Sequence, residues 1–142
     1  MQFDPNNPVI RLCIKGMEME AQNPAEASAL FLRAWNEATN DFEKFTAAHY
    51  LARHQPTTAE KLQWDETALS FALRINDSSM PANYPSLYLN IGKCYEELTD
   101  FKAAQKNYQL ALSYSDQLPD NGYGQTIKAG IKNGLERVSI NN

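Results

Sequence analysis

The apolar residues of this sequence recur three and four positions apart along most of the chain, and this spacing constrains the fold more than any other feature. It places the apolar side chains on one face of an α-helix, whereas a half-buried strand would show strict alternation. Asn, Pro, Thr and Asp stand just ahead of the apolar runs, as they commonly do at helix starts. The pattern therefore predicts an all-α protein.

Three helix starts are marked by local capping chemistry. Asn7 and Asn23 are each followed by a proline, which suits the first position of a helix because the missing N–H has no partner there in any case. Thr57 is followed three positions later by Glu60, the arrangement of a capping box. A helix is therefore expected to begin directly after each of Asn7, Asn23 and Thr57.

Seven helices are expected in all, as three antiparallel pairs and a C-terminal capping helix. Proline at position 56 ends the third helix, because proline disfavours helix in the residue before it. The polar stretch 77–83 is expected to be a loop. The expected pairs and the capping helix lie at about 8–40, 41–77, 84–117 and 122–138.

Length and charge limit the class of protein. A chain of 142 residues is expected to form a single domain, spanning 1–142. Its net charge of -4 argues against nucleic acids and membranes as partners, because both bind clustered Lys and Arg. No basic leader with an apolar run begins the chain, so a cytoplasmic protein is expected. Cys13 and Cys94 lie in apolar helical patterns and are expected to be reduced packing residues.

The third helix pair resembles the tetratricopeptide repeat (TPR) family, whose units of about 34 residues stack into a solenoid. Small residues stand where the two helices of a unit touch, and aromatic or apolar residues fill the gaps between units. The matching residues are Tyr88, Ile91, Gly92, Tyr95, Ala104, Tyr108 and Ala111. The resemblance implies a right-handed α–α superhelix with a concave groove that binds a peptide or protein segment.

The resemblance covers about residues 8–118 but is detailed only in the third pair. In the first pair, Ala27, Phe31 and Ala34 match the second helix, while Gly16 falls one position late. In the second pair, Thr46 or His49 stands where the family has glycine. The first two pairs are therefore expected to be divergent repeats.

Candidate ligand residues follow from the resemblance, since the first helix of each TPR pair lines the groove. An apolar strip near Leu89 would supply affinity, with Arg53, Asn90 and Lys93 orienting the partner. Arg53 could instead form a surface ion pair with Glu43 or Asp41. The candidate groove residues are His49, Tyr50, Arg53, Ser86, Leu89, Asn90, Lys93 and Glu97.

Two other functions remain open from the sequence. One is a small-molecule or enzymatic pocket around His49, Tyr50, Arg53 and Trp64. The other is self-association into a homodimer through exposed apolar groove residues. No catalytic motif is found, and the two histidines point apart on a helix, so no enzyme activity, cofactor or metal site is expected. The leading prediction is an interaction module whose protein or peptide partner the sequence does not identify.

Overall fold

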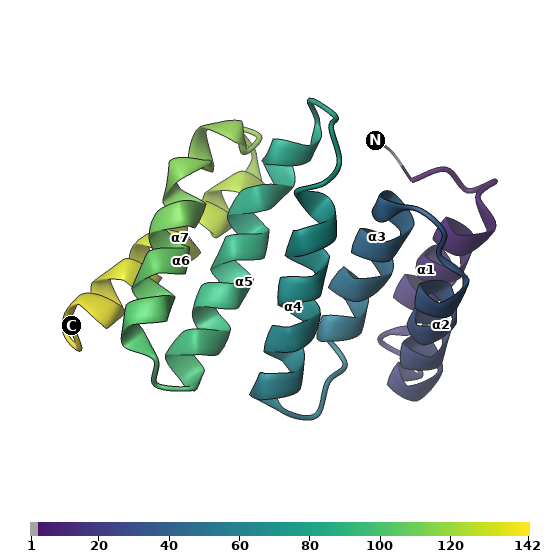
Figure 1. Ribbon diagram of the computed structural model, residues 1–142, viewed down its shortest axis with the longest axis horizontal. Coiled ribbons are helices and arrows are strands. Elements are labelled where there is room, and N and C mark those ends of the chain that lie inside the picture. Colours follow the sequence, from purple (N-terminus) through teal and green to yellow (C-terminus); the bar gives the residue numbers. More distant parts are fainter. Residues whose placement is uncertain (1–2) are drawn as a thin grey trace. The chain divides into compact units, whose positions relative to one another are not determined.

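The computed structural model describes residues 3–142, and within that range it contains seven α-helices, two short 3-10 helices and no strand (Figure 1). The all-α prediction is confirmed. Short loops join consecutive helices, so that each pair runs antiparallel. The α-helices are α1 (Pro8–Met19), α2 (Pro24–Glu37), α3 (Asp41–Ala52), α4 (Thr58–Ala72), α5 (Tyr84–Glu97), α6 (Phe101–Ser113) and α7 (Gly122–Ser139).

Side-chain caps begin the helices as the sequence indicates. The Asn7 side chain accepts hydrogen bonds from the first backbone N–H groups of α1. Asn23 and Thr57 accept from the N–H groups of Glu26 and Glu60, each at 3.2 Å. These bonds satisfy N–H groups that have no partner within the helix. The three predicted helix starts are therefore confirmed.

The chain divides into two compact units, Met1–Asn76 and Asp77–Asn142. The boundary coincides with the start of the polar stretch that was expected to be a loop. Part of that stretch is helical, because Met80–Asn83 forms a 3-10 helix whose first residue is buried. Burial of the Met80 side chain gives this segment a packing role that its polar composition does not reveal.

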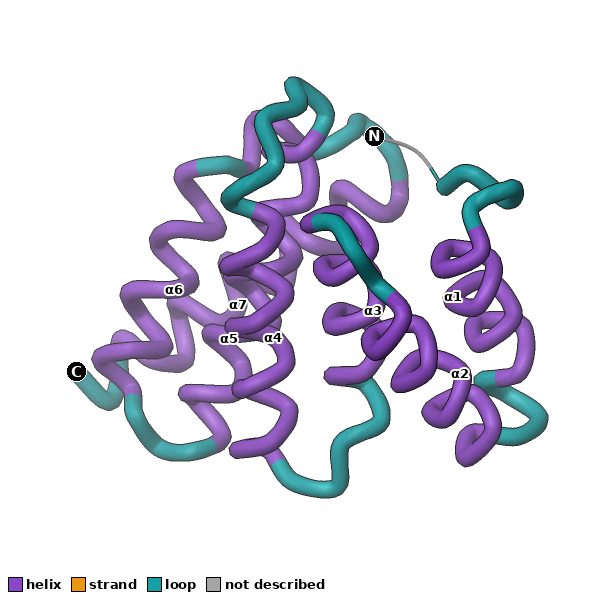
Figure 2. The backbone as a smooth tube through the Cα atoms, turned by 45° about the vertical axis from the view of Figure 1, so that its right-hand side comes forward, coloured by secondary structure: helices purple, strands orange, loops and turns teal. Residues whose placement is uncertain are grey.

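In the first unit, α1 packs on α2 and α3 packs on α4, while α3 also contacts α1 and α2 (Figure 2). Three fully buried residues form the inner face of α2, namely Ala27, Phe31 and Ala34. A Cβ atom on Gly16 would lie only 2.4 Å from the Phe31 ring. Gly16 therefore allows α1 to approach the Phe31 ring of α2 closely.

In the second unit, α5 packs on α6, and α7 packs against both. The fully buried residues of α6 are Ala104, Tyr108 and Ala111. The Tyr108 ring lies between two glycines, since Cβ atoms on Gly92 and Gly134 would approach it to 2.7 and 2.6 Å. Glycine at both positions is what allows three helices to enclose one aromatic ring.

Candidate functional site

The structure distributes the eight candidate groove residues over the two units. His49 and Tyr50 lie on α3 and Arg53 is its C-cap. The other five lie on α5. They are Ser86, Leu89, Asn90, Lys93 and Glu97.

His49 is a packed residue of the first unit. Its ring lies 6.1 Å from the Phe45 ring and 5.1 Å from the Tyr50 ring, centroid to centroid. Its Nδ1 atom is buried and has no hydrogen-bond partner among the described residues. Burial, with a smaller contribution from the Arg53 charge, lowers the pKa of His49 to about 4. The imidazole is therefore neutral at pH 7 and has no positive charge to offer an anionic ligand.

Tyr50 fills the space between α2 and α3. Its ring stacks on Phe31 with the centroids 5.2 Å apart, and the Arg53 guanidinium lies 4.8 Å from its centroid. Burial raises the pKa of the Tyr50 phenol. These contacts assign Tyr50 to packing of the helices, with Arg53 covering its ring.

Arg53 pairs with a carboxylate that the sequence interpretation did not consider. Its Nη1 lies 3.1 Å from Glu20 Oε1, and Glu20 Oε2 lies 2.9 Å from His54 Nε2. The expected partners are engaged elsewhere, because Asp41 faces Arg74 at 3.8 Å and Glu43 is buried. The suggested pairing with Glu43 or Asp41 is therefore wrong. The Arg53 side chain is still 51% exposed, so a partner could reach it.

Glu43 joins the start of α3 to the start of α1. Its carboxylate accepts hydrogen bonds from Asn7 Nδ2 at 2.8 Å, the Thr39 backbone N–H at 2.9 Å and Asn40 Nδ2 at 3.0 Å. Burial opposes ionisation, but these hydrogen bonds outweigh it and hold the pKa of Glu43 below its usual value. The carboxylate is thus a structural group whose acceptor capacity is already used.

Four of the five α5 candidates form one polar stripe along the helix. They are four, three and four positions apart, which places them on a single face. Lys93 and Glu97 are exposed, while Ser86 and Asn90 are half-buried. The Ser86 hydroxyl donates to the Asn83 carbonyl at 3.2 Å and so is committed to the helix start.

Leu89 lies off this stripe and beneath α7. Only 3% of the residue is exposed, and a Cβ atom on Gly130 would lie 3.1 Å from Leu89 Cδ2. The apolar strip expected near Leu89 is therefore covered by a helix of the same chain. A partner would contact Leu89 only if α7 moved away.

A cavity of about 260 Å³ lies between α5 and α7, at the C-terminal end of the polar stripe. Its lining residues are Lys93, Glu96, Glu97 and Arg137. Glu96 accepts a 2.7 Å hydrogen bond from the Tyr108 hydroxyl and a 2.8 Å bond from Arg137 Nε. The Arg137 hydrogen bond is the main reason that the pKa of Glu96 lies below its usual value. The sequence interpretation found Lys93 and Glu97 but missed Arg137, which is 41 residues from Glu96.

The Glu96–Arg137 pair of the second unit has a counterpart in the Glu20–Arg53 pair of the first. In the first unit, Glu20 at the end of α1 binds Arg53 at the end of α3. In the second unit, Glu96 near the end of α5 binds Arg137 near the end of α7. Four positions before each glutamate stands the glycine that contacts an aromatic ring, Gly16 or Gly92. The two units therefore share one arrangement, with α7 in the place that α3 occupies.

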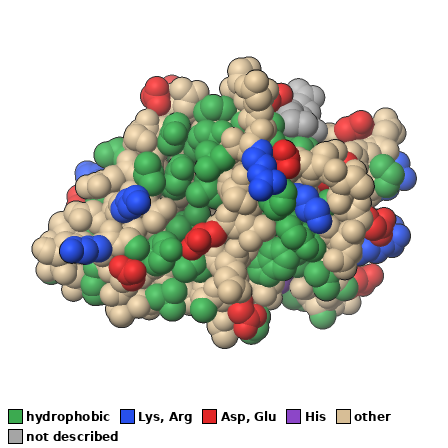
Figure 3. Space-filling model, viewed as in Figure 1, with side chains coloured by type: hydrophobic (Ala, Val, Ile, Leu, Met, Phe, Trp, Pro, Cys, Tyr) green, Lys and Arg blue, Asp and Glu red, His purple; other side chains and the backbone are tan. Residues whose placement is uncertain are grey.

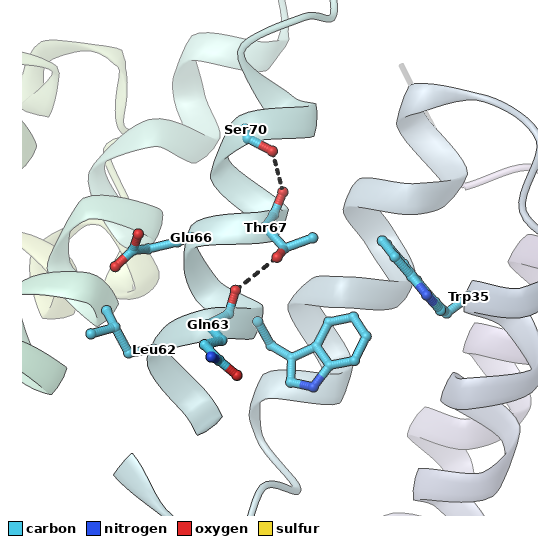
Figure 4. A pocket seen from close by; sticks show the side chains of 7 residues that line it. Trp35, Leu62, Gln63, Glu66, Thr67 and Ser70 are labelled. Atoms are coloured by element: carbon cyan, nitrogen blue, oxygen red, sulfur yellow. Dashed lines mark hydrogen bonds between the residues drawn. The ribbon is translucent and has the colours of Figure 1, made fainter. Parts of the chain in front are cut away.

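A larger cavity, about 630 Å³, lies on the first unit between α2 and α4. Trp64 contributes to its wall, as the small-molecule interpretation expected, but His49, Tyr50 and Arg53 do not. Its lining residues are Trp35, Leu62, Gln63, Trp64, Glu66, Thr67 and Ser70 (Figure 4).

Within residues 3–142, no group of three or more His, Cys, Asp or Glu side chains is arranged to hold a metal ion. None of the helices described has both the length and the apolar character needed to cross a membrane. Comparison of the chain with protein-family models, with curated proteins and with solved structures gives no match.

Proposed function

We propose that this chain is a helical-repeat interaction module that binds a peptide or protein segment on the polar stripe of α5. The observation that carries the proposal is the cavity at the end of the stripe, where Lys93 and Glu97 meet Arg137. Lys93 can donate three hydrogen bonds, and the Asn90 amide can both donate and accept. Together they suit the carbonyl and carboxylate oxygens of a bound segment.

Rigidity of the surrounding helices supports this assignment. Glu96 ties α5 to Tyr108 of α6 and to Arg137 of α7. Because these bonds fix the helix that carries the stripe, little conformational entropy would be lost on binding. Since Leu89 is covered, polar contacts would supply much of the affinity, and we expect binding to weaken as salt is added.

The repeated glycine, aromatic and Glu–Arg arrangement supports a TPR-like scaffold. We infer that the helix pairs are successive repeats of a right-handed superhelix, with α7 standing as the first helix of an incomplete repeat. Small-angle X-ray scattering tests this inference, because a superhelix gives a larger radius of gyration than a globule of 142 residues.

Self-association and a small-molecule site remain the rival functions. Multi-angle light scattering across a range of concentrations tests for a homodimer. A small-molecule site around His49, Arg53 and Trp64 receives less support, because the cavity beside Trp64 does not include the other two residues.

The function is tested by affinity capture from native lysate with the wild type and with Lys93→Glu. Lys93 is a cleaner probe than Arg53, since Arg53→Glu would place a second carboxylate beside Glu20 and disturb the fold. Lys102→Glu on α6 is the matched control, because it makes the same charge change at an exposed residue away from the cavity.

We expect Lys93→Glu to lose specific partners that Lys102→Glu retains, with equal melting temperatures for the two variants. Asn90→Ala should lose the same partners. Identical captured proteins for the wild type and Lys93→Glu would remove the α5 stripe as the binding surface.

A further inference from the structure

Large hydrophobic side chains reach the surface of the protein in several places (Figure 3). Two of the exposed residues are aromatic, Phe3 at 40% and Tyr123 at 51% exposure. Within residues 3–142, Tyr123 contacts no other ring, whereas Phe3 contacts two. The Phe3 ring is thus held on the protein, and the residues that hold it define a site for an aromatic side chain.

This site lies on α3, between Phe42 and Tyr50. The Phe3 centroid is 6.2 Å from that of Phe42 and 6.5 Å from that of Tyr50, and the rings meet at 71° and 68°. The two α3 residues are eight positions apart, or about 12 Å along the helix axis, so a ring that contacts both lies between them. Edge-to-face contacts of this kind favour an aromatic side chain over an aliphatic one.

The space between these two α3 rings accommodates a third ring. Phe3 occupies it in the structure, although the Tyr50 ring also stacks on Phe31. Thr46 stands midway between the two α3 rings on the same helix face, and it is buried. Its hydroxyl donates to the carbonyl one turn earlier at 2.7 Å, so its hydrogen bond is made within the helix. An apolar ring therefore lies here without leaving the hydroxyl unsatisfied.

A tight turn before α1 directs Phe3 onto α3. The Asn7 N–H donates to the Asp4 carbonyl at 3.0 Å, which closes the turn. Asn7 Nδ2 donates to the Glu43 carboxylate at 2.8 Å and so ties the end of the turn to the start of α3. The segment that leads into α1 therefore runs beside α3 (Figure 1).

Phe3 itself is held less firmly than the turn that follows it. Within residues 3–142 it takes part in no hydrogen bond, and the ring contacts with Phe42 and Tyr50 retain it. Two such contacts favour the docked position by about tenfold. The ring therefore leaves the site in a small fraction of the molecules, and the site is then open to another aromatic side chain.

We propose that Phe3 is an internal occupant of this site, and that an aromatic side chain of a partner segment takes its place between Phe42 and Tyr50. The docked Phe3 ring is then an autoinhibitory contact. Because the two rings compete for one space, the apparent affinity for the partner is reduced by the fraction of molecules in which Phe3 has left. The site lies in a different unit from the α5 stripe, and it does not depend on the function proposed there.

The probe is an N-acetylated, C-amidated peptide with the sequence of residues 1–7, whose phenylalanine is its one aromatic residue. It is titrated into the isotope-labelled full chain, as wild type and as Phe3→Ala, and binding is followed by the amide NMR shifts of Thr46 and Tyr50. A comparison peptide has leucine in place of phenylalanine. Tyr123→Ala is the matched control, because it removes an exposed aromatic ring that lies on α7, outside the site.

Phe3→Ala should bind the phenylalanine peptide with a dissociation constant about tenfold lower than that of the wild type, because the internal competitor is gone. Tyr123→Ala should bind like the wild type. The leucine peptide should bind Phe3→Ala about tenfold more weakly than the phenylalanine peptide does. Without peptide, the wild type should show a nuclear Overhauser effect between the ring protons of Phe3 and Tyr50. Circular dichroism melting checks that each variant is folded.

Several results would overturn the proposal. Absence of the Overhauser effect in the wild type would show that Phe3 does not occupy the site, and its loss on dilution would place Phe3 on a second copy of the chain. Equal affinity of the wild type and Phe3→Ala would show that Phe3 does not compete. Equal affinity for the leucine peptide would show that the site does not select aromatic side chains. A folded Phe3→Ala variant without peptide shifts at Thr46 and Tyr50 would show that the vacated site binds no ring.

Discussion

Lowering the pH from 7 to 5 is expected to destabilise this protein through His49. The imidazole has a pKa of about 4 in the folded chain, compared with 6.5 for an exposed histidine. Because the folded-state pKa is lowered, the unfolded chain binds the proton more tightly between these values. The contribution of neutral His49 to the free energy of unfolding is therefore fully present above about pH 6.5, and it is lost as the pH falls toward 4.

The magnitude follows from the two pKa values. Proton linkage gives a loss of about 2 kcal/mol in the free energy of unfolding between pH 7 and pH 5. The carboxylates of Glu43 and Glu96 do not interfere, because hydrogen bonds lower the pKa of each and keep both ionised in this range. The buried Nδ1 without a partner is the physical origin of the effect, since nothing solvates the charge that protonation would create.

The assay is urea unfolding at a series of pH values, followed by circular dichroism, for the wild type and His49→Leu. The leucine variant should match or exceed the wild type at pH 7, because an unsatisfied polar ring is replaced by an apolar group. It should also lose most of the pH dependence. His54→Gln alters the chain's other histidine and is the matched control. Retention of the full wild-type slope in His49→Leu would refute the reasoning.

Three further predictions concern the backbone, the helix contacts and the thiols. Thr99 follows α5 with a φ of 62°, so Thr99→Gly should raise the free energy of unfolding by about 1 kcal/mol in chemical denaturation; an unchanged value would show that the turn is not strained. Gly134→Ala should lower it by about 2 kcal/mol through overlap with Tyr108, whereas Gly122→Ala, where no atom lies within 4 Å, should have little effect. Burial and the nearby Glu43 charge raise the pKa of Cys13 to about 12, so its thiol should resist Ellman's reagent at pH 8 until urea unfolds the chain.

The helices were largely predictable because their signals are local. A capping residue and the N–H group that it binds are two or three positions apart, so the sequence shows both partners. Three local caps were missed, those made by Asn40, Asp100 and Asn121. Asn40 was assigned to the end of α2, whereas its side chain accepts from the Glu43 N–H and begins α3. The same residue type is common near both ends of helices, and the sequence pattern did not distinguish them.

The candidate site was less predictable, because its contacts join distant segments. Asn90, Lys93 and Glu97 were assigned to one face of a helix, and they lie on one face of α5. A capping helix was expected at 122–138, but the sequence pattern did not show that its Gly130 would lie on Leu89. Glycine is compatible with an exposed turn or with a close helix contact, and only the packing of α7 distinguishes the two.

The sequence by itself determined seven helices, three of their caps and the small residues at the helix contacts of the first and third pairs. Only the tertiary structure decided which charged side chains form ion pairs and which aromatic rings are in contact. Arg53 binds Glu20 across 33 positions and Arg137 binds Glu96 across 41, while Trp35 and Trp64 meet from different helices. The physical reason is range: a helix cap depends on neighbouring residues, whereas these contacts depend on which helices pack together and in what register. The TPR resemblance that the sequence suggests remains a proposal about the scaffold, and the candidate binding surfaces depend on contacts that the sequence does not show.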